Sequence, residues 1–204
     1  MESDIVLQAA RRVDWRFLLP CPDSKDVLYV GREGGSLVES LRLFSTSLTV
    51  VTDARGLDAL EKNYDVVVTS EPSHASLPRI IGKIAPGGWL YVEARRRFRL
   101  GVGWPGDGRK LLRDERTLCH APDYAAALRR LGLEEVAAHW HWPNLEACLE
   151  IVPLADRPAV VHSLARRTGG RLARLKAALG YGLLRTGLLA RLVPYFSVVG
   201  RSAH

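Results

Sequence analysis

A glycine-rich run and a later acid are the residues best placed for ligand chemistry. Gly31, Gly34 and Gly35 come directly after a short apolar run. Glycines let a backbone approach a ligand closely, and such a turn between a strand and a helix is typical of nucleotide-binding sheets. Asp53 follows the next apolar run, 48–52, at about the twenty-residue distance of an acid that binds a ribose. Asp53 could equally cap the helix that follows it.

A second group of polar residues follows the third apolar run, 64–70. Ser70 and Glu71 stand where that run ends, and His74 lies just beyond them. In a parallel sheet the carboxyl ends of the strands form the edge where ligands bind. We therefore expect Ser70 and Glu71 to line a site and His74 to be a candidate general base. The alternative for His74 is an exposed loop histidine.

Basic and aromatic residues after the fourth apolar run are candidates for substrate binding. Arg95 and Arg97 leave that run toward the same edge and could bind an anion through forked hydrogen bonds. The alternative is a solvated loop. Trp104 lies in the segment 95–122, which is rich in Arg, Gly and Pro and long enough to be a binding loop. Trp142 is a candidate either for lining a substrate pocket or for packing into the core.

A metal site is not predicted. His139 and His141 alternate with Trp140 and Trp142, so a strand here would place the histidines on one face and the tryptophans on the other. Two histidines at this spacing can share a metal, but no third ligand is predictable nearby. The three cysteines are far apart and form no C-x-x-C pair, so we expect small buried side chains in a reducing compartment: Cys21, Cys119 and Cys148.

The elements that position these residues form an alternating α/β pattern. An amphipathic helix is expected over 5–19, and a final helix over 123–131 is followed by two strand-like runs that form an antiparallel hairpin over 134–154. A mainly parallel sheet of about six strands follows, because the buried apolar runs alternate with helices. The remaining expected strands are 26–30, 48–52, 64–70 and 89–94, and the helices between them are 36–44, 57–62 and 77–84.

The order and spacing of these motifs over about residues 26–154 resemble the class I S-adenosylmethionine-dependent methyltransferases. Five features carry the resemblance: the glycine run, Asp53, the run Tyr64-Asp65-Val66-Val67, the turn Ala85-Pro86-Gly87-Gly88 and the closing hairpin. The resemblance implies a Rossmann-like fold and S-adenosylmethionine as cofactor. It implies a cofactor site made of Gly31, Gly34, Gly35, Asp53, Ser70 and Glu71, with His74 as a base for O- or N-methyl transfer.

The chain departs from the family pattern at the turn and at one strand. Glu33 stands where the family has glycine, and Tyr29 stands where an acid is usual. We expect the Glu33 side chain to point outward, because a carboxylate aimed at the methionine carboxylate would be repelled. Between Asp53 and Asp65 there is room for one short helix, so the family's third strand is expected to be missing.

The last fifty residues differ in composition from the rest. We expect residues 1–154 to form the methyltransferase-like domain and residues 155–204 to form a basic helical extension that packs on it or on a partner. Such helices could also lie on an anionic membrane. Covering the sheet or forming a subunit interface is the preferred interpretation, and the run 195–199 could add a strand.

These features together predict methyl transfer from S-adenosylmethionine to a small metabolite, anionic or glycosylated. A non-catalytic methyltransferase-like scaffold or partner subunit, and a peripheral membrane accessory protein, remain alternatives. The net charge of +7 allows acidic partners, but too few aromatic residues accompany the basic ones to favour nucleic acid. Neither a signal peptide nor a charge-free spanning segment is visible, so a cytoplasmic location is expected, with peripheral membrane contact or homo-oligomerisation open.

Overall fold

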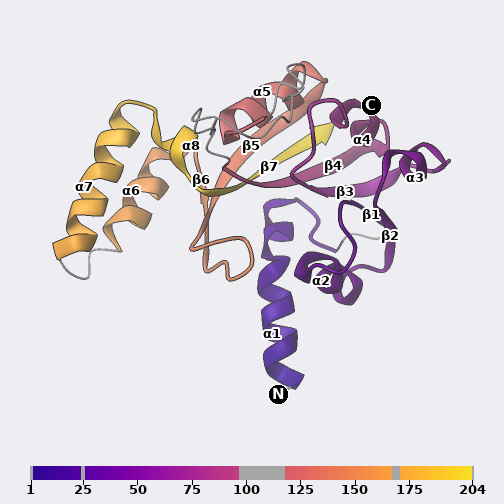
Figure 1. The fold of residues 1–204 in the computed structure, drawn as a ribbon, viewed down its shortest axis with the longest axis horizontal. Coiled ribbons are helices and arrows are strands. Elements are labelled where there is room, and N and C mark those ends of the chain that lie inside the picture. The colour runs from indigo at the N-terminus through magenta and orange to yellow at the C-terminus, as the bar shows by residue number, and fades with distance from the viewer. Residues whose placement is uncertain (1, 24–25, 97–117, 167–170, 204) are drawn as a thin grey trace, which may run out of the picture.

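A seven-stranded mixed sheet forms the centre of the molecule (Figure 1). The computed structural model describes residues 2–23, 26–96, 118–166 and 171–203. In the order β2-β1-β3-β4-β7-β5-β6, the first four strands are parallel, β7 is antiparallel to both of its neighbours, and β6 is antiparallel to β5. The strands are β1 (Asp26–Val30), β2 (Ser47–Val51), β3 (Tyr64–Ser70), β4 (Ile84–Arg95), β5 (Leu133–Trp142), β6 (Glu150–Pro153) and β7 (Tyr195–Ser202).

The apolar runs form central strands because both faces of the sheet are covered. Val67 and Val68 point to opposite faces of β3, and both are fully buried. Two core clusters result, one on each face. Among the strand residues, Val27, Val66, Val67, Val68 and Leu90 are buried, while Val50 on the edge strand β2 and Val30 at the carboxyl end of β1 are half-buried.

The family's third strand is missing, as the sequence predicted. The segment between Asp53 and Tyr64 contains only the short helix α3 (Ala54–Asp58) and turns. The strand before this segment, β2, is the edge of the sheet. The absence of the family's third strand therefore shortens the sheet at that edge without interrupting the core.

Helices cover the two faces unequally. On one face α1 (Glu2–Arg12), the 3₁₀ helix η1 (Asp14–Leu18) and α2 (Ser36–Phe44) meet the sheet, and Trp15 stacks on Tyr91 of β4 with ring centroids 3.9 Å apart. The single helix expected over 5–19 is thus two pieces. The other face carries α4 (Leu77–Ile81), α5 (Ala121–Arg130), α6 (Arg157–Ala165) and α8 (Leu189–Leu192).

The turn Ala85-Pro86-Gly87-Gly88 lies within β4 rather than before it. β4 begins at Ile84, and its pairing with β3 shifts register between Tyr64 and Val66. Gly87 has a φ of +74°, in the left-handed region, and a side chain at Gly88 would meet the carbonyl oxygens of Ala85 and Asp65 at 2.9 Å. The two glycines therefore allow the irregular start of this strand.

The C-terminal segment completes the sheet. β7 lies between β4 and β5, and Phe196, Val198 and Val199 are buried there. The expectation that the apolar residues after 183 cover the domain is confirmed for this strand. The division of the chain at residue 154 stays a prediction.

Figure 1 shows α6 and α7 (Arg171–Arg185) lying side by side at one end of the molecule, while α1 projects from another side. None of the helices in the described ranges is long and apolar enough to cross a membrane.

Candidate functional site

Two clefts open at the edge where the parallel strands end. The first, here called the Asp53 cleft, has a volume of about 440 Å³ and lies over the ends of β1, β2 and β3. The second, the Glu93 cleft, has a volume of about 610 Å³ and lies over the ends of β1, β3 and β4. Ser70 at the end of β3 lines both clefts. The two clefts are therefore neighbours at the carboxyl edge of the parallel strands, the edge where ligands bind in many parallel sheets.

The Asp53 cleft combines an apolar wall with one carboxylate. Val30, Leu57 and Ile80 contribute apolar surface, and Gly31 and Asp53 lie beside them. The Asp53 Oδ1 accepts a 2.7 Å hydrogen bond from the Gly56 backbone N–H and so caps α3. The capping role left open by the sequence is therefore present. It does not remove Asp53 from the cleft, because a carboxylate has a second oxygen.

The glycine run is shaped by Tyr29. The Gly31 N–H donates to the Val51 carbonyl oxygen at 3.0 Å, which joins the turn to β2. A side chain at Gly31 would meet the Tyr29 hydroxyl at 2.6 Å, so the present position of the Tyr29 ring depends on a glycine here. Gly34 has a φ of +85°, and it lines neither cleft. Gly35 precedes α2, lines the Glu93 cleft and faces open space.

The Glu33 side chain points outward, as predicted. It is 67% exposed and lies 3.7 Å from the exposed Arg42 guanidinium. It lines neither cleft, so the replacement of the family's middle glycine adds no carboxylate to the site.

A buried ion pair lies in the Glu93 cleft. Arg12, from the end of α1, places its Nη2 atom 2.7 Å from both carboxylate oxygens of Glu93, and both residues are 6% exposed. Arg12 Nε also donates to Ser36 Oγ at 3.3 Å, and Ser70 Oγ donates to Glu93 Oε1 at 2.8 Å. This network joins α1, the start of α2, β3 and β4 at the site.

Tyr29 lies at the edge of the same network. Its hydroxyl donates to Ser70 Oγ at 3.5 Å. Burial raises the pKa of Tyr29, and the negative charge of Glu93 acts in the same direction. Tyr29 is therefore a neutral hydrogen-bond donor at neutral pH.

The other wall of the Glu93 cleft comes from the connection between β5 and β6. Leu145 and Glu146 line it, and Glu146 Oε1 accepts a 2.9 Å hydrogen bond from Arg95 Nη2. Arg95 thus lies at the cleft, as the sequence predicted for a substrate-binding residue, but it is paired with an acid. Glu71 lines the cleft with a φ of +48°, and its N–H donates to the Glu93 carbonyl oxygen at 2.8 Å.

Two other described candidates, His74 and Trp142, line neither cleft. His74 is half-buried in the loop between β3 and α4 and lines neither cleft, so its role as a base stays a prediction. Trp142 is half-buried and packs against the core on the face that carries α5. Arg97 and Trp104 lie outside the described residues.

Sequence reasoning missed Arg12 and Glu93. The sequence contained a reason to single out Glu93. It is an acid inside the apolar run 89–94, and burying its charge there without a partner would be costly. Arg12 had a weaker one, since it shares its helix with other charged residues and only the fold brings it to β4. A residue 81 positions away in the chain could not be inferred from spacing.

The histidines and tryptophans of β5 alternate as predicted. Trp140 is packed in the core on the face of α5, while His139 and His141 are buried on the opposite face. Burial lowers the pKa of His139 to about 4; burial, then the charges of His139 and Arg12, lowers that of His141 to about 3. His141 Nε2 lies 2.7 Å from Ser197 Oγ, and its Nδ1 lies 3.4 Å from Cys148 Sγ.

From the sequence, no metal site was predicted and the three cysteines were expected to be buried. Among the described residues, no group of three or more His, Cys, Asp or Glu side chains could hold a metal ion. Cys148 is buried, as expected, but Cys119 is half-buried and Cys21 is exposed. The expectation of burial is therefore wrong for Cys21, which follows η1 at the surface.

Comparisons with known proteins give the fold. No protein-family model matches the chain, and no curated protein matches its sequence. A SAM-dependent methyltransferase from Archaeoglobus fulgidus has a TM-score of 0.51 at 13% identity, over 96% of this chain and 94% of that one. Seven strands with an antiparallel strand inserted after the parallel ones therefore form the Rossmann-like fold of the class I S-adenosylmethionine-dependent methyltransferases.

Two further solved structures are similar at lower scores. Phosphoethanolamine N-methyltransferase 2 from Haemonchus contortus, in complex with S-adenosyl-L-methionine, has a TM-score of 0.49 at 11% identity, over 95% of this chain. The chain spans about half of that protein, 52% of its length. A SAM-dependent methyltransferase from Thermotoga maritima has a TM-score of 0.46 at 11% identity, over 96% of this chain and 89% of that one.

Proposed function

We propose that this chain binds S-adenosylmethionine across the two clefts and transfers its methyl group to a small metabolite. The observation that carries the proposal is the pair of clefts that share Ser70. One of them offers apolar walls and a carboxylate, and the other offers charges of both signs. Adenosine needs the first kind of surface and a charged amino acid needs the second.

The Asp53 cleft fits the adenosine part. Val30, Leu57 and Ile80 provide apolar surface for a purine, and the Asp53 oxygen that is not used in the cap of α3 can accept from ribose hydroxyls. Gly31 lies between this wall and Tyr29. The purine therefore lies beside Gly31, on the side away from the Tyr29 ring.

The Glu93 cleft fits the methionine part. Its lining contains both arginines and glutamates, so opposite charges are available for an ammonium and a carboxylate. Gly35 leaves open space at the start of α2, where backbone N–H groups favour an anion. The charged lining residues are Arg12, Arg32, Arg95, Glu71, Glu93 and Glu146.

Methyl transfer depends more on how the acceptor and the methyl group are aligned than on acid–base groups of the chain. When bound, S-adenosylmethionine supplies an electrophilic methyl group on a sulfonium. This chain holds the acceptor in line with that methyl group and excludes water, an effect that contributes a large share of the rate in such transfers. Arg95 at the cleft, with Arg97, Trp104 and Trp142, would recognise an anionic or glycosylated acceptor, and His74 would take its proton.

Calorimetric titration with S-adenosylmethionine and S-adenosylhomocysteine tests the proposal. We expect both to bind the wild-type chain. Gly35→Val should weaken binding by about tenfold or more with little change in Tm, because its side chain enters open cleft space. Gly82→Ala is the control, since its side chain would make only ordinary 3.5 Å contacts and Gly82 lines neither cleft.

Asp53 allows a finer test, because its two functions separate. Asp53→Asn keeps a side chain that caps a helix as well as aspartate does, but it loses the charge that strengthens a hydrogen bond from ribose. Asp53→Ala loses both. Weaker binding by Asp53→Asn at unchanged stability supports a ribose contact. Equal binding by the wild type and Asp53→Asn would remove Asp53 from the site.

A non-catalytic methyltransferase-like protein is the second candidate. The observation that favours it is the position of Tyr29, whose hydroxyl fills the space above Gly31. The same titration decides, since a folded wild-type chain that binds neither compound at millimolar concentration is a scaffold rather than an enzyme.

A further inference from the structure

The charges of this chain are divided sharply between its two parts. The whole chain has 29 basic and 22 acidic residues, and all 22 acids precede residue 157. Residues 157–204 contain nine arginines and lysines and no Asp or Glu. Residues 1–156 therefore have 20 basic and 22 acidic residues, and the entire positive excess belongs to the C-terminal part. Because no acids offset the basic residues in this stretch, its helices create a positive electrostatic potential around this part of the chain.

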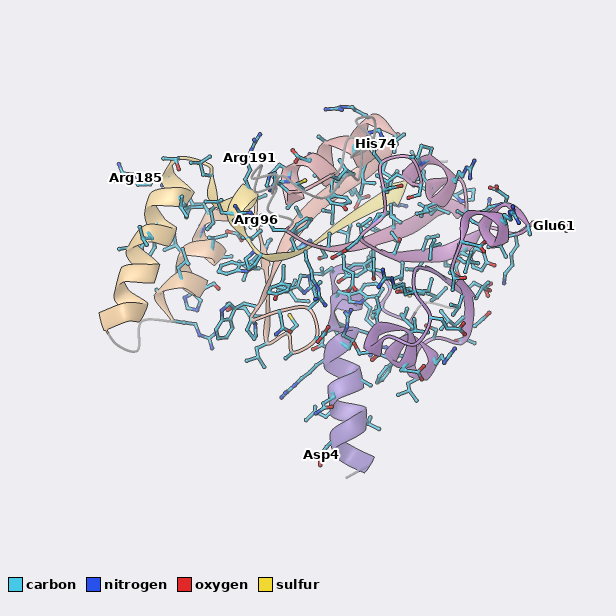
Figure 2. All side chains as sticks on the ribbon, viewed as in Figure 1. Asp4, Glu61, His74, Arg96, Arg185 and Arg191 are labelled. Atoms are coloured by element: carbon cyan, nitrogen blue, oxygen red, sulfur yellow. The ribbon has the colours of Figure 1, made fainter. Side chains whose placement is uncertain are left out.

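The fold places the acid-free helices α6 and α7 together at one end of the molecule (Figure 1). Figure 1 shows α6 and α7 together at the end opposite α3, and Figure 2 places Arg185 on α7 at that end and Glu61 at the other. We call the exposed surface of α6, α7 and α8 the basic end. Its described arginines are Arg157, Arg166, Arg185 and Arg191, all exposed.

Arg185 at the end of α7 and Arg191 in α8 are available to a partner. Among the described residues, neither Arg185 nor Arg191 forms an ion pair or a side-chain hydrogen bond. Arg96 lies nearby, because its Nη1 donates to the Leu192 carbonyl oxygen at 3.0 Å. A third cation, from the end of β4, is thus held against α8.

Apolar side chains are exposed among these charges. Leu188, between α7 and α8, is 47% exposed, and Leu179 on α7 is 60% exposed. Leu188 stands three residues from Arg185 and three from Arg191. Leucine flanked by arginines matches the boundary of an anionic bilayer, where acyl chains take the leucine and headgroups take the guanidinium groups.

We propose that the basic end docks on the surface of an anionic phospholipid bilayer, with Leu188 entering the headgroup layer. A nucleic acid fits less well, because its sites combine cations with large aromatic side chains for stacking, and the described part of α6–α8 exposes no Phe, Tyr or Trp. Its single tyrosine, Tyr181, is half-buried and donates to the Val161 carbonyl oxygen. Docking would bring the chain to a membrane surface, independently of what the two clefts bind.

Vesicle co-sedimentation of the full chain tests the proposal. We expect binding to phosphatidylcholine vesicles that contain about 30% phosphatidylserine, little binding to phosphatidylcholine alone, and release when salt shortens the range of the charges. Arg185→Glu should weaken partitioning by about tenfold or more. Leu188→Gln should weaken it several-fold, because an exposed leucine loses the area it would bury.

Matched variants separate docking from general effects. Arg55→Glu makes the same charge change on an exposed arginine of α3, at the opposite end, and Leu149→Gln makes the same polar change on a leucine that is 64% exposed elsewhere. Both should bind vesicles as the wild type does. Circular dichroism checks that each variant is folded.

Three results would overturn the proposal. One is no vesicle binding by the wild type. Another is equal weakening by Arg55→Glu and Arg185→Glu, which would show a net-charge effect. The last is binding to a fluorescent oligonucleotide that Arg185→Glu weakens and Leu188→Gln does not, without vesicle binding, which would assign the basic end to nucleic acid.

Discussion

The buried pair of Arg12 and Glu93 should be worth far more to stability than an exposed pair of the same chemistry. Arg12→Leu leaves the Glu93 carboxylate buried with only the Ser70 hydroxyl as a side-chain donor. Removing one partner of a buried ion pair typically costs about 3–5 kcal/mol. For a chain of this size, that loss lowers the Tm by about 6–20 °C.

The same cleft provides the control. Arg95 and Glu146 lie 2.9 Å apart, but their side chains are 56% and 64% exposed. Arg95→Leu should therefore cost only about 0–1 kcal/mol, because water screens the charges and solvates whichever partner remains. The two substitutions differ in burial and share their chemistry.

Urea unfolding followed by tryptophan fluorescence gives the free energies, and a double-mutant cycle gives the coupling. We expect Glu93→Gln also to destabilise, and the double variant Arg12→Leu, Glu93→Gln to cost less than the sum of the single changes by about 1–3 kcal/mol. An Arg12→Leu variant no less stable than Arg95→Leu would refute the reasoning. Additive single changes would show that the two charges do not stabilise each other.

Three other predictions follow from burial and packing. Because burial holds the pKa of His139 at about 4 and that of His141 at about 3, below the usual 6.5, only the unfolded chain binds their protons between pH 6.5 and 4. The two histidines therefore stabilise the fold fully above about pH 6.5, and urea unfolding should show this stability falling by about 1.4 kcal/mol per pH unit for each of them on acidification. A His139→Asn variant with the same pH slope as the wild type would contradict this. Ending the chain after Pro153 should give insoluble protein in an expression test, because β7 fills the sheet between β4 and β5, and a soluble fragment with native circular dichroism would argue otherwise. Gly88→Ala should lower the Tm, because its side chain would meet two carbonyl oxygens at 2.9 Å, whereas Gly82→Ala should not; equal Tm values would disprove the clash.

Local patterns predicted the parts of the fold that depend on neighbouring residues. The run over 64–70 is apolar on both faces, and a strand covered on both sides needs that composition. The short distance between Asp53 and Asp65 leaves no room for a strand, and none is found there. The exposure of Glu33 followed in the same way from chemistry within a few residues.

The site was predicted in part for a related reason. The strand ends supplied Asp53, Ser70, Glu71 and Arg95, because a parallel sheet gathers its carboxyl ends at one edge. Gly35 at the start of α2 was also predicted, but Arg12, Leu145 and Glu146 were not, and neither was the contact between Tyr29 and Gly31. The orientation of a side chain depends on its tertiary packing, and the spacing of residues in the sequence does not determine that packing.

Sequence alone therefore determined the parallel strands, the glycine turn that follows the first of them and the edge where a site was to be sought, since each depends on local propensity and period. Only the tertiary structure decided that Arg12 meets Glu93, and that β7 enters the middle of the sheet rather than its margin. It also decided that the acid-free C-terminal helices gather at one end of the molecule. These contacts join residues tens of positions apart, and they form because burying apolar surface and pairing buried charge favour one global arrangement over many that are locally equivalent.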